Sequence, residues 1–207
     1  AVVEAQASNF RQGDTVNISG YSWDASENVS LNITSPAGLV YTTNVTTNAS
    51  GEFNLTRQLD YNASLGLYSI NAIQPSNENK TDSFTFMVAR RIATVTMTYD
   101  WYKPSENIAI QGTNYEPFNN VSFIISNTSQ TVVSVILTAN KSGGINYTWH
   151  VPPGQGLDNY TVYAEDEDYA NLNASYAFEV VDERLLLSSK LVKNDDLVMI
   201  TGRYFDR

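Results

Sequence analysis

The chain of 207 residues repeats itself at a fixed spacing, and this repeat limits the folds that are open to it. When each residue is set against the one 92 positions later, the two stretches align without gaps from about Phe10 to Ala89. The alignment predicts two copies of one structural unit. The clearest matches are Ile18-Ser19-Gly20 with Ile110-Gln111-Gly112, Asn28-Val29-Ser30 with Asn120-Val121-Ser122, and Asn48-Ala49-Ser50-Gly51 with Asn140-Lys141-Ser142-Gly143.

Each unit consists of short segments of alternating apolar and polar residues, separated by turn signals. No segment has a convincing 3.6-residue period of the kind that marks a helix. Seven such segments in about 90 residues predict an all-β fold of tandem immunoglobulin-like β-sandwiches. In the first copy the expected strands are Val2–Ala7, Thr15–Tyr21, Val29–Thr34, Leu39–Thr43, Glu52–Gln58, Leu67–Ile73 and Ser83–Val88.

The repeat divides the chain into residues 1–89, residues 90–183 and the start of a third, incomplete copy at residues 184–207. Two strands with an uncovered apolar face are marginal, so either the parent chain continues or this tail completes a sheet elsewhere. A sharper hypothesis is that Leu185–Arg207 adds strands to an adjacent subunit and so builds a filament. The junctions contain no Gly or Pro, which predicts a semi-rigid rod rather than flexibly linked units.

Asn-x-Ser/Thr sequons are far more frequent than composition explains. The 22 Asn and the 39 Ser and Thr would give roughly four by chance, whereas the chain has fourteen, none with Pro in the middle. The excess predicts a surface that carries N-linked sugar. The sequon asparagines are Asn17, Asn28, Asn32, Asn44, Asn48, Asn54, Asn62, Asn79, Asn120, Asn127, Asn140, Asn146, Asn159 and Asn173.

The expected strands place these asparagines out of phase with the apolar residues. In the segment Val29–Ile33 the apolar side chains stand at odd positions, whereas Asn28 and Asn32 stand at even ones. Asn17, Asn54 and Asn146 show the same relation to their neighbours. Because side chains of a strand alternate between its two faces, these asparagines should face solvent, as a glycan requires.

The chain has no cysteine, which excludes a disulfide framework, a thiolate metal site and a cysteine nucleophile. Sequons place the chain outside the cell, where animal domains usually carry disulfides. The combination therefore indicates an archaeal protein with an extracellular, cell-surface location. No apolar run approaches the 18 residues of a membrane span, and no signal peptide precedes the first expected strand. We expect any export signal or anchor to lie outside this segment.

The formal net charge is −10 and the isoelectric point about 4.4. An acidic surface repels phosphate, which disfavours nucleic acid and anionic lipid as partners. The densest acidic cluster is Glu165-Asp166-Glu167-Asp168, expected in the loop between the last two strands of the second copy. Its oxygen ligands would suit Ca²⁺, with Asp182-Glu183 and Asp195-Asp196 near the next junction as further ligands. A solvated acidic loop is the alternative that the spacing favours, since no EF-hand pattern is present.

No catalytic arrangement stands out, and the sequence predicts that the segment is not an enzyme. The single histidine, His150, alternates out of phase with Tyr147 and Trp149 and should lie outside. Neither a nucleophile pattern nor a glycine-rich phosphate loop accompanies it. Trp23, Trp101 and Trp149 would offer a platform for stacking sugar, but packing within the units is the favoured interpretation.

The segments Gly13–Gly20, Val29–Gly38, Ser50–Phe53 and Leu65–Ile70 resemble the macroglobulin-like and Ig-like repeats of large secreted proteins. Such repeats occur in archaeal surface-layer glycoproteins and related cell-surface proteins. The resemblance covers nearly the whole chain and is specific for fold but weak for function, because it rests on turn and core residues. It implies no catalytic residues. The second copy departs from it where Asp158-Asn159 replaces Gly66-Leu67.

One further feature of the resemblance is a Leu-x-x-Tyr pattern at the sixth strand of each copy. It places Tyr68 and Tyr160 where immunoglobulin-like folds have a tyrosine corner.

The function expected from sequence is structural. The segment would be an N-glycosylated part of an archaeal surface layer or surface filament, acting as a semi-rigid spacer and assembly module. Its partners would be neighbouring copies or domains of the same protein, together with N-linked glycans. Two alternatives remain open: an adhesin or receptor stalk, which is a binding module, and accessory domains of a secreted hydrolase.

Overall fold

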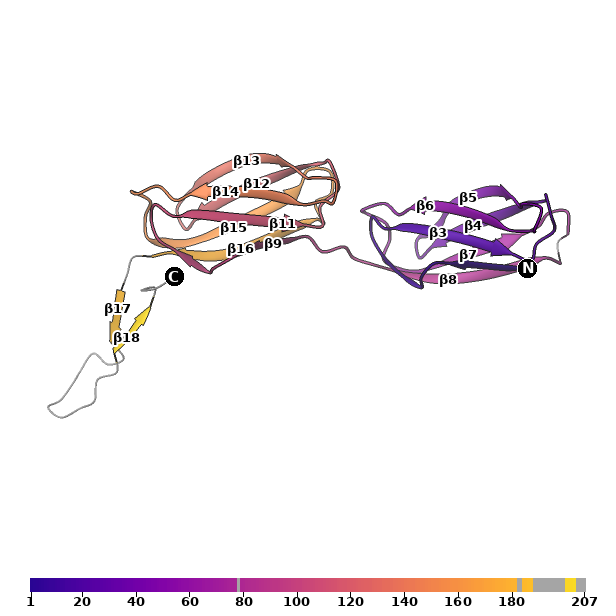
Figure 1. The fold of residues 1–207 in the computed structure, drawn as a ribbon, viewed down its shortest axis with the longest axis horizontal. Coiled ribbons are helices and arrows are strands. Elements are labelled where there is room, and N and C mark those ends of the chain that lie inside the picture. The colour runs from indigo at the N-terminus through magenta and orange to yellow at the C-terminus, as the bar shows by residue number, and fades with distance from the viewer. Residues whose placement is uncertain (78, 182–183, 188–199, 204–207) are drawn as a thin grey trace. The chain divides into compact units, whose positions relative to one another are not determined.

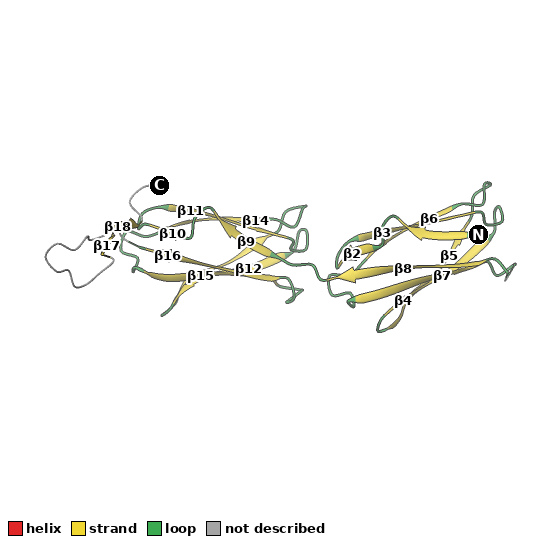
Figure 2. Cartoon of the chain, turned by 90° about the horizontal axis from the view of Figure 1, so that it is seen from below, coloured by secondary structure: helices red, strands yellow, loops and turns green. Residues whose placement is uncertain are grey.

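The computed structural model describes residues 1–77, 79–181, 184–187 and 200–203 (Figure 1). The chain divides into two compact units, Ala1–Arg91 and Ile92–Arg207, called here domain 1 and domain 2. The Arg91 side chain is bound within domain 1, where its Nε donates to the Gln12 carbonyl at 2.6 Å. All regular elements in the described ranges are strands, which confirms the predicted all-β class (Figure 2).

Domain 1 is a sandwich of two sheets. One sheet has the strand order β1-β3-β6 and the other the order β2-β8-β7-β4-β5. The seven strands predicted for this copy are all present. The strands are β1 (Val2–Ala5), β2 (Asn9–Arg11), β3 (Thr15–Tyr21), β4 (Asn28–Ser35), β5 (Gly38–Thr46), β6 (Phe53–Gln58), β7 (Gly66–Ile73) and β8 (Thr81–Ala89).

Domain 2 repeats this arrangement strand for strand. Its sheets have the orders β9-β11-β14 and β10-β16-β15-β12-β13. Cross-strand partners agree at the 92-residue offset: Gly20 pairs with Val3, and Gly112 pairs with Val95. The strands are β9 (Thr94–Met97), β10 (Trp101–Tyr102), β11 (Asn107–Thr113), β12 (Asn120–Asn127), β13 (Thr131–Thr138), β14 (Ile145–His150), β15 (Asp158–Asp166) and β16 (Asn173–Val180).

The first strand of each domain changes sheets, and this feature was absent from the sequence-based strand assignment. After pairing with β3, the chain crosses over so that β2 runs parallel to β8, where the Met87 N–H donates to the Ser8 carbonyl at 2.8 Å. In domain 2, β10 runs parallel to β16 in the same way. Trp101 and Tyr102 therefore form a short strand that the sequence analysis did not assign.

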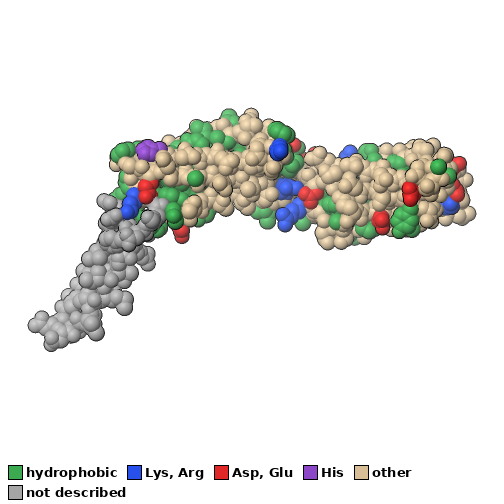
Figure 3. Space-filling model, in the orientation of Figure 1, with side chains coloured by type: hydrophobic (Ala, Val, Ile, Leu, Met, Phe, Trp, Pro, Cys, Tyr) green, Lys and Arg blue, Asp and Glu red, His purple; other side chains and the backbone are tan. Residues whose placement is uncertain are grey.

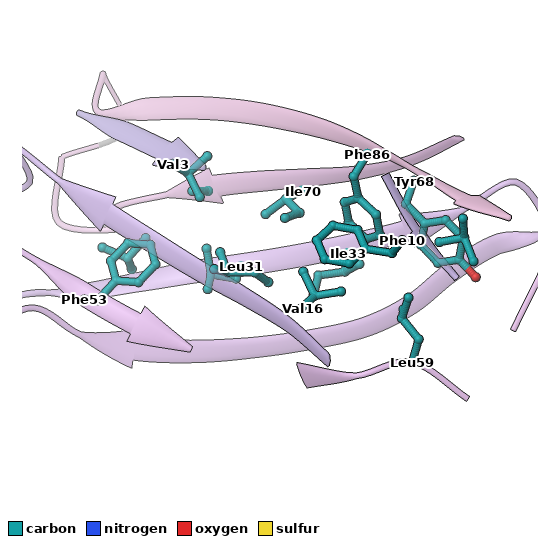
Figure 4. Close-up of a cluster of buried hydrophobic side chains, with 14 of the residues drawn as sticks. Val3, Phe10, Val16, Leu31, Ile33, Phe53, Leu59, Tyr68, Ile70 and Phe86 are labelled. Atoms are coloured by element: carbon teal, nitrogen blue, oxygen red, sulfur yellow. The ribbon is translucent and has the colours of Figure 1, made fainter. Parts of the chain in front are cut away.

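The core of domain 1 follows from the alternation of its strands. Along β4 the side chains of Val29, Leu31 and Ile33 are buried, while the residues between them face outward. Figure 4 shows Ile33 with Phe10, Phe86 and Tyr68 at one end of this core, where the Tyr68 and Phe86 rings stack with centroids 5.2 Å apart. Burial of each large apolar side chain contributes about 1.5–3 kcal/mol, so the two-sheet core is the main source of stability.

Each domain has a turn that requires glycine, and the two turns lie at equivalent positions. The Trp23 and Tyr115 N–H groups donate to the carbonyls of Gly51 and Gly143, each at 3.1 Å. Both glycines have positive φ, 74° and 72°. A Cβ at either position would overlap the carbonyl oxygen of the facing aromatic residue. Only glycine fits this conformation without strain.

The two predicted corner tyrosines are buried at equivalent positions in β7 and β15. The Tyr160 hydroxyl donates to the Gly156 carbonyl at 2.8 Å, four residues upstream, as in a tyrosine corner. Burial raises the pKa of Tyr68 above its ordinary value, against the opposing effect of a hydrogen bond with the Ser64 backbone. These hydroxyls tie the loop before the strand to the sandwich.

Residues 184–187 and 200–203 form an antiparallel pair, β17 (Arg184–Leu187) and β18 (Ile200–Arg203). Gly202 pairs with Leu185, which is the partnership that Gly112 makes with Val95. The backbone register thus agrees with a third occurrence of the repeat. The hypothesis that Leu185–Arg207 completes another subunit depends largely on residues outside the described ranges.

No helix in the described part of the chain is long and apolar enough to cross a membrane.

Candidate glycosylation surface

The fourteen sequon asparagines all lie at the surface. Twelve are exposed, and Asn32 and Asn127 are half-buried. The predicted outward orientation is therefore confirmed, whereas glycosylation itself stays a prediction. Ten of them lie on strands and four in loops, namely Asn48, Asn62, Asn79 and Asn140.

The strand positions share one physical cause. In β3 the buried Val16 and Ile18 flank Asn17, whose side chain is exposed, and in β14 the exposed Asn146 follows the buried Ile145. Because the inward positions of both sheets are filled by the core, an asparagine at the opposite parity projects its amide into solvent. An attached sugar at such a position would not disturb the packing.

Three sequons recur at the same structural place in both domains. Asn28 pairs with Thr46 and Asn120 with Thr138, and each threonine hydroxyl donates to the asparagine Oδ1, at 3.0 and 3.5 Å. Asn54 and Asn146 are likewise equivalent, since their partners Ser19 and Gln111 lie 92 positions apart. The third pair is Asn48 and Asn140, which open equivalent turns.

These two turns hold the side-chain oxygen of the sequon asparagine that begins them. The Oδ1 of Asn140 accepts hydrogen bonds from the N–H groups of Ser142 and Gly144, at 2.8 and 3.0 Å. The Oδ1 of Asn48 accepts equivalent bonds from Ser50 and Glu52. The turn thus fixes the side chain through its oxygen. The Nδ2 atom of Asn48, to which an N-linked sugar would be joined, donates to the Glu52 carboxylate at 3.1 Å, and both asparagines are exposed.

Some sequons are close neighbours across strands. Asn17 pairs with Thr56 while Asn54 pairs with Ser19, so the two asparagines are diagonal neighbours on the outer face of one sheet. Diagonal neighbours of this kind are about 7–8 Å apart. Asn44 has the same relation to both Asn28 and Asn32 on the other sheet. Each outer face of domain 1 thus carries a cluster of sequons.

One part of domain 1 lacks sequons. No sequon asparagine lies on β7 or β8, although Asn71 of β7 is exposed. Leu67 and Met87 pair across these strands with 57% and 42% of their surfaces exposed. We call Leu65, Leu67 and Met87 the sequon-free patch. Elsewhere the visible surface is mainly uncharged polar side chains and backbone, with charges scattered (Figure 3).

The acidic cluster is not the loop that the sequence predicts. Glu165 and Asp166 belong to β15, and only Glu167 and Asp168 follow it. Strand alternation turns Asp166 inward, where it is 1% exposed. The Glu165 carboxylate faces the other way and accepts a hydrogen bond from the Tyr163 hydroxyl, which raises the pKa of Tyr163. The Glu165 and Asp166 carboxylates therefore lie on opposite faces of β15, and Glu167 and Asp168 are exposed after it.

The buried Asp166 is satisfied by protein donors. Its Oδ1 accepts from Asn119 Nδ2 at 2.6 Å, and its Oδ2 accepts from the Glu116 N–H at 3.0 Å. Two further N–H groups, of Asp168 and Tyr169, also donate to Oδ1. In the described ranges no three His, Asp or Glu side chains come together in a way that could hold a metal ion. The further ligands considered at 182–183 and 195–196 lie outside those ranges.

His150 is exposed, as its strand phase predicts, and its Nδ1 lies 3.0 Å from Asn107 Oδ1 on the paired strand. Trp23 is buried in domain 1, where its Nε1 donates to the Val2 carbonyl at 2.9 Å. Trp149 is buried in domain 2, and Trp101 is half-buried on β10. Packing rather than a shared stacking platform explains Trp23 and Trp149.

Sequence reasoning missed one concave feature, a cavity of about 230 Å³ inside domain 1. Arg57 lies at its rim, and Tyr68 and Phe86 line it. The sequence offered one partial signal, since the repeat aligns Arg57 with the much bulkier Trp149 of the second copy.

Comparison with known proteins gives a family match for part of the chain. Residues 1–86 match the family described as Macroglobulin-like domain. A search of curated proteins found none that matches the chain.

Several solved structures are similar at low identity. A trypsin-activated alpha-2-macroglobulin from Escherichia coli has 16% identity and a TM-score of 0.36, over 88% of this chain and 16% of that one. A Salmonella alpha-2-macroglobulin reacted with methylamine has 15% identity and a TM-score of 0.37, over 97% of this chain and 16% of that one. A tetra-tandem repeat in the extending region of a large adhesion protein has 21% identity and a TM-score of 0.37, over 86% of this chain and 48% of that one.

The present chain thus spans about one sixth of the macroglobulin chains and about half of the adhesion-protein chain. The family match covers domain 1, and domain 2 has the same strand order and register.

Proposed function

We propose that this segment is an N-glycosylated structural part of an extracellular coat or surface filament, and that the cell which makes it is an archaeon. The observation that carries the proposal is the outward position of all fourteen sequon asparagines on a duplicated sandwich. Such a surface accepts carbohydrate without loss of core packing. In this proposal the chain contributes shape and spacing, and no reaction is assigned to it.

The absence of cysteine supports the archaeal assignment. A domain outside the cell commonly gains stability from disulfides. Here each sandwich instead relies on its two-sheet core and on polar loops that hydrogen bonds close, as at Asp166. A chain with many sequons and no cysteine therefore fits an archaeal surface better than an animal one.

The junction supports a role as a spacer. Arg91, the last residue of domain 1, donates to the Gln12 carbonyl at 2.6 Å and to Asp14 Oδ1 at 2.5 Å. Ile92, the first residue of domain 2, accepts a hydrogen bond at its carbonyl from Asn114 Nδ2 at 2.9 Å. Arg91 is thus bound by domain 1 and the adjacent Ile92 by domain 2, with no residue between them. A junction of this kind limits bending, whereas a long Gly/Ser linker would permit it.

The proposed partners are neighbouring copies or domains of the same protein. Sugars on the outer faces would discourage unspecific pairing of exposed strands, which is a hazard of open sheets. Assembly would then use the surface that carries no carbohydrate.

The sequon-free patch favours a second candidate function, that of an adhesin or receptor stalk. Leu67, 57% exposed, and Met87, 42% exposed, form an apolar area beside strands that lack sequons. Exposed apolar patches often mark interaction sites. A binding module would use this face, whereas a pure spacer would leave it without a specific partner.

Site-by-site peptide mapping of the protein purified from its native cells tests the proposal. We expect sugar on most of the fourteen asparagines and none on Asn71, which is exposed but lacks a sequon. Unmodified peptides at all sequons would refute the proposal. If sugar is found and the sequon-free patch also retains a soluble partner in pull-downs that a Leu67→Asp variant loses, the stalk function replaces the spacer function.

A further inference from the structure

Domain 1 contains a cavity between its two sheets. Its volume is about 230 Å³, and its walls come from β3 and β6 of one sheet, from β4, β5, β7 and β8 of the other, and from the loop between β6 and β7. An enclosed apolar cavity of about 150 Å³ is enough to hold benzene. The cavity of domain 1 therefore has room for a somewhat larger ring system.

The inner wall is apolar. Val16, Ile33 and Phe86 line it together with Tyr68, and Figure 4 shows these side chains gathered at one end of the core. The Tyr68 and Phe86 rings stack at 5.2 Å with an angle of 21° between their planes. An aromatic guest would find ring faces and edges here, which favour offset or edge-to-face contacts.

The rim is polar and carries two charges. The Arg57 guanidinium lies over the Tyr41 ring, 4.3 Å from its centroid, and is paired with no carboxylate in the described ranges. Asp60 is exposed, and its Oδ1 accepts a hydrogen bond from the Asn62 N–H at 3.0 Å. Because Asp60 and Asn62 are both exposed and both line the cavity, it opens to solvent on their side.

In domain 2 a tryptophan side chain stands at the position equivalent to Arg57. Val16 pairs with Arg57, and at the equivalent register Ile108 pairs with Trp149. Trp149 is 6% exposed, and its indole packs on Tyr160 and Phe178 at 5.6 and 6.1 Å.

Tyr160 and Phe178 are the equivalents of Tyr68 and Phe86, and they stack at 5.5 Å. In domain 2 an indole of the chain itself therefore covers the same ring pair. In domain 1 the Arg57 side chain lies over the Tyr41 ring at the cavity instead of covering the ring pair, and Tyr68 and Phe86 line the cavity.

We infer that the cavity of domain 1 is a binding site for a small aromatic carboxylate with a ring system of about indole size. The ring takes the place beside Tyr68 and Phe86 that the Trp149 indole takes in domain 2. The carboxylate lies at the rim, where the Arg57 guanidinium donates hydrogen bonds to it. A guanidinium matches a carboxylate with two parallel N–H donors, and such charged hydrogen bonds are the stronger kind.

The charged side chains at the rim of the cavity favour a ligand with a carboxylate over a ligand with an amine. The Asp60 carboxylate already accepts an N–H from its own loop, whereas the Arg57 donors have no anionic partner in the described ranges. A ligand amine would face the Arg57 charge. Asn62 at the rim is one of the fourteen sequon positions, so the site is tested in chain that carries no sugar.

Isothermal titration of the full chain, produced without glycosylation, tests the inference with three probes. Indole-3-acetate should bind saturably at one site, about tenfold more tightly than indole. Tryptamine, with the same ring and the opposite charge, should bind more weakly than indole. No saturable binding of any probe would overturn the inference. Tighter binding of tryptamine than of indole-3-acetate would overturn the assignment of a carboxylate.

Two variants locate the site. Arg57→Trp copies domain 2, so it should fill the cavity and abolish binding of both indole and indole-3-acetate. Arg57→Met keeps the stem without the charge, and indole-3-acetate should then bind no more tightly than indole. Arg90→Met, at an exposed arginine outside the cavity, is the control and should leave both affinities unchanged. Undiminished binding by Arg57→Trp would place the site elsewhere and refute the inference.

Discussion

Gln74 and Asp166 occupy the same place in the two domains, and each is 1% exposed. The Gln74 Oε1 accepts the Asp24 N–H at 3.2 Å, and its Nε2 donates to the Asp24 carboxylate at 2.7 Å. In domain 2 the carboxylate is the buried group: Asp166 accepts from the Glu116 N–H and from the Asn119 amide. Each domain thus pairs one carboxylate with one amide. The buried partner is the amide in domain 1 and the carboxylate in domain 2.

This exchange predicts the effect of Gln74→Asp. The new carboxylate, buried at position 74, would face the half-exposed carboxylate of Asp24 without the amide donor, and like charges repel. We expect the free energy of unfolding of domain 1 to fall by about 2 kcal/mol or more at neutral pH. Adding Asp24→Asn should recover much of the loss, because it supplies an amide as Asn119 does. Additive effects of the two changes in denaturant unfolding would contradict the pairing.

Gly51→Ala should destabilise domain 1 by more than about 1 kcal/mol. Gly51 has a φ of 74°, and a Cβ there would overlap the Trp23 carbonyl oxygen. Gly143→Ala should have a similar effect on domain 2. Gly154→Ala is the control, because Gly154 has no neighbour within 4 Å of an added Cβ. Thermal unfolding measures all three, and equal melting temperatures for Gly51→Ala and Gly154→Ala would be inconsistent with the turn geometry.

Domain 1 should lose stability in acid through Asp24. A hydrogen bond from Lys80, and next one from Gln74, lower the pKa of Asp24 below its ordinary value of 3.8. A carboxyl with a lowered folded-state pKa stabilises the fold above its unfolded pKa, about 4, and this contribution is lost as pH falls through the folded value.

Hydrogen exchange of the backbone amides in β3 and β7, measured from pH 6 to pH 2.5, would report this loss of stability. Asp24→Asn should show a flatter dependence on pH in domain 1, while Asp158→Asn, in domain 2, should leave the domain 1 profile unchanged. Identical profiles for Asp24→Asn and the parent chain would contradict the role of Asp24.

Arg91→Ala together with Asn114→Ala should loosen the junction. The two changes remove the contacts that hold Arg91 to domain 1 and Ile92 to domain 2. Spin labels placed one in each domain should then give a broader distance distribution by electron paramagnetic resonance. Arg90→Ala, at an exposed residue of the same segment, should leave the width unchanged. An equally narrow distribution in the double variant would show that these contacts do not restrict bending.

Strand alternation made most of the fold predictable. Along β4, for example, Val29, Leu31 and Ile33 alternate with polar residues, and this period alone identifies a strand with one buried face. The outward asparagines followed from the same period. The 92-residue repeat gave a second, independent prediction of each strand.

The missing elements are those with too few residues to show a period. β2 has three residues and β10 has two, and both pair in parallel with the last strand of their domain. The buried aromatic residues Phe10 and Tyr102 were the available signal, 92 positions apart. The inward turn of Asp166 was missed because neighbouring acidic residues suggested a loop, whereas the strand continues through this residue.

The cavity of domain 1 could not be derived from pattern alone. Arg57 and Trp149 stand at the same strand phase, yet the Arg57 side chain lies over the Tyr41 ring at the cavity while Trp149 fills the core. The direction of a long side chain depends on its neighbours in space, and these become known only when the sheets are packed.

The intact mass of the segment, isolated from the cells that produce it, tests the central claim most directly. The polypeptide alone has a mass of 23.0 kDa. We predict that the native protein is spread over several glycoforms and that its mass falls to a single lower value after N-linked carbohydrate is removed. An unchanged mass after this treatment would show that the outward asparagines are bare and would contradict the account.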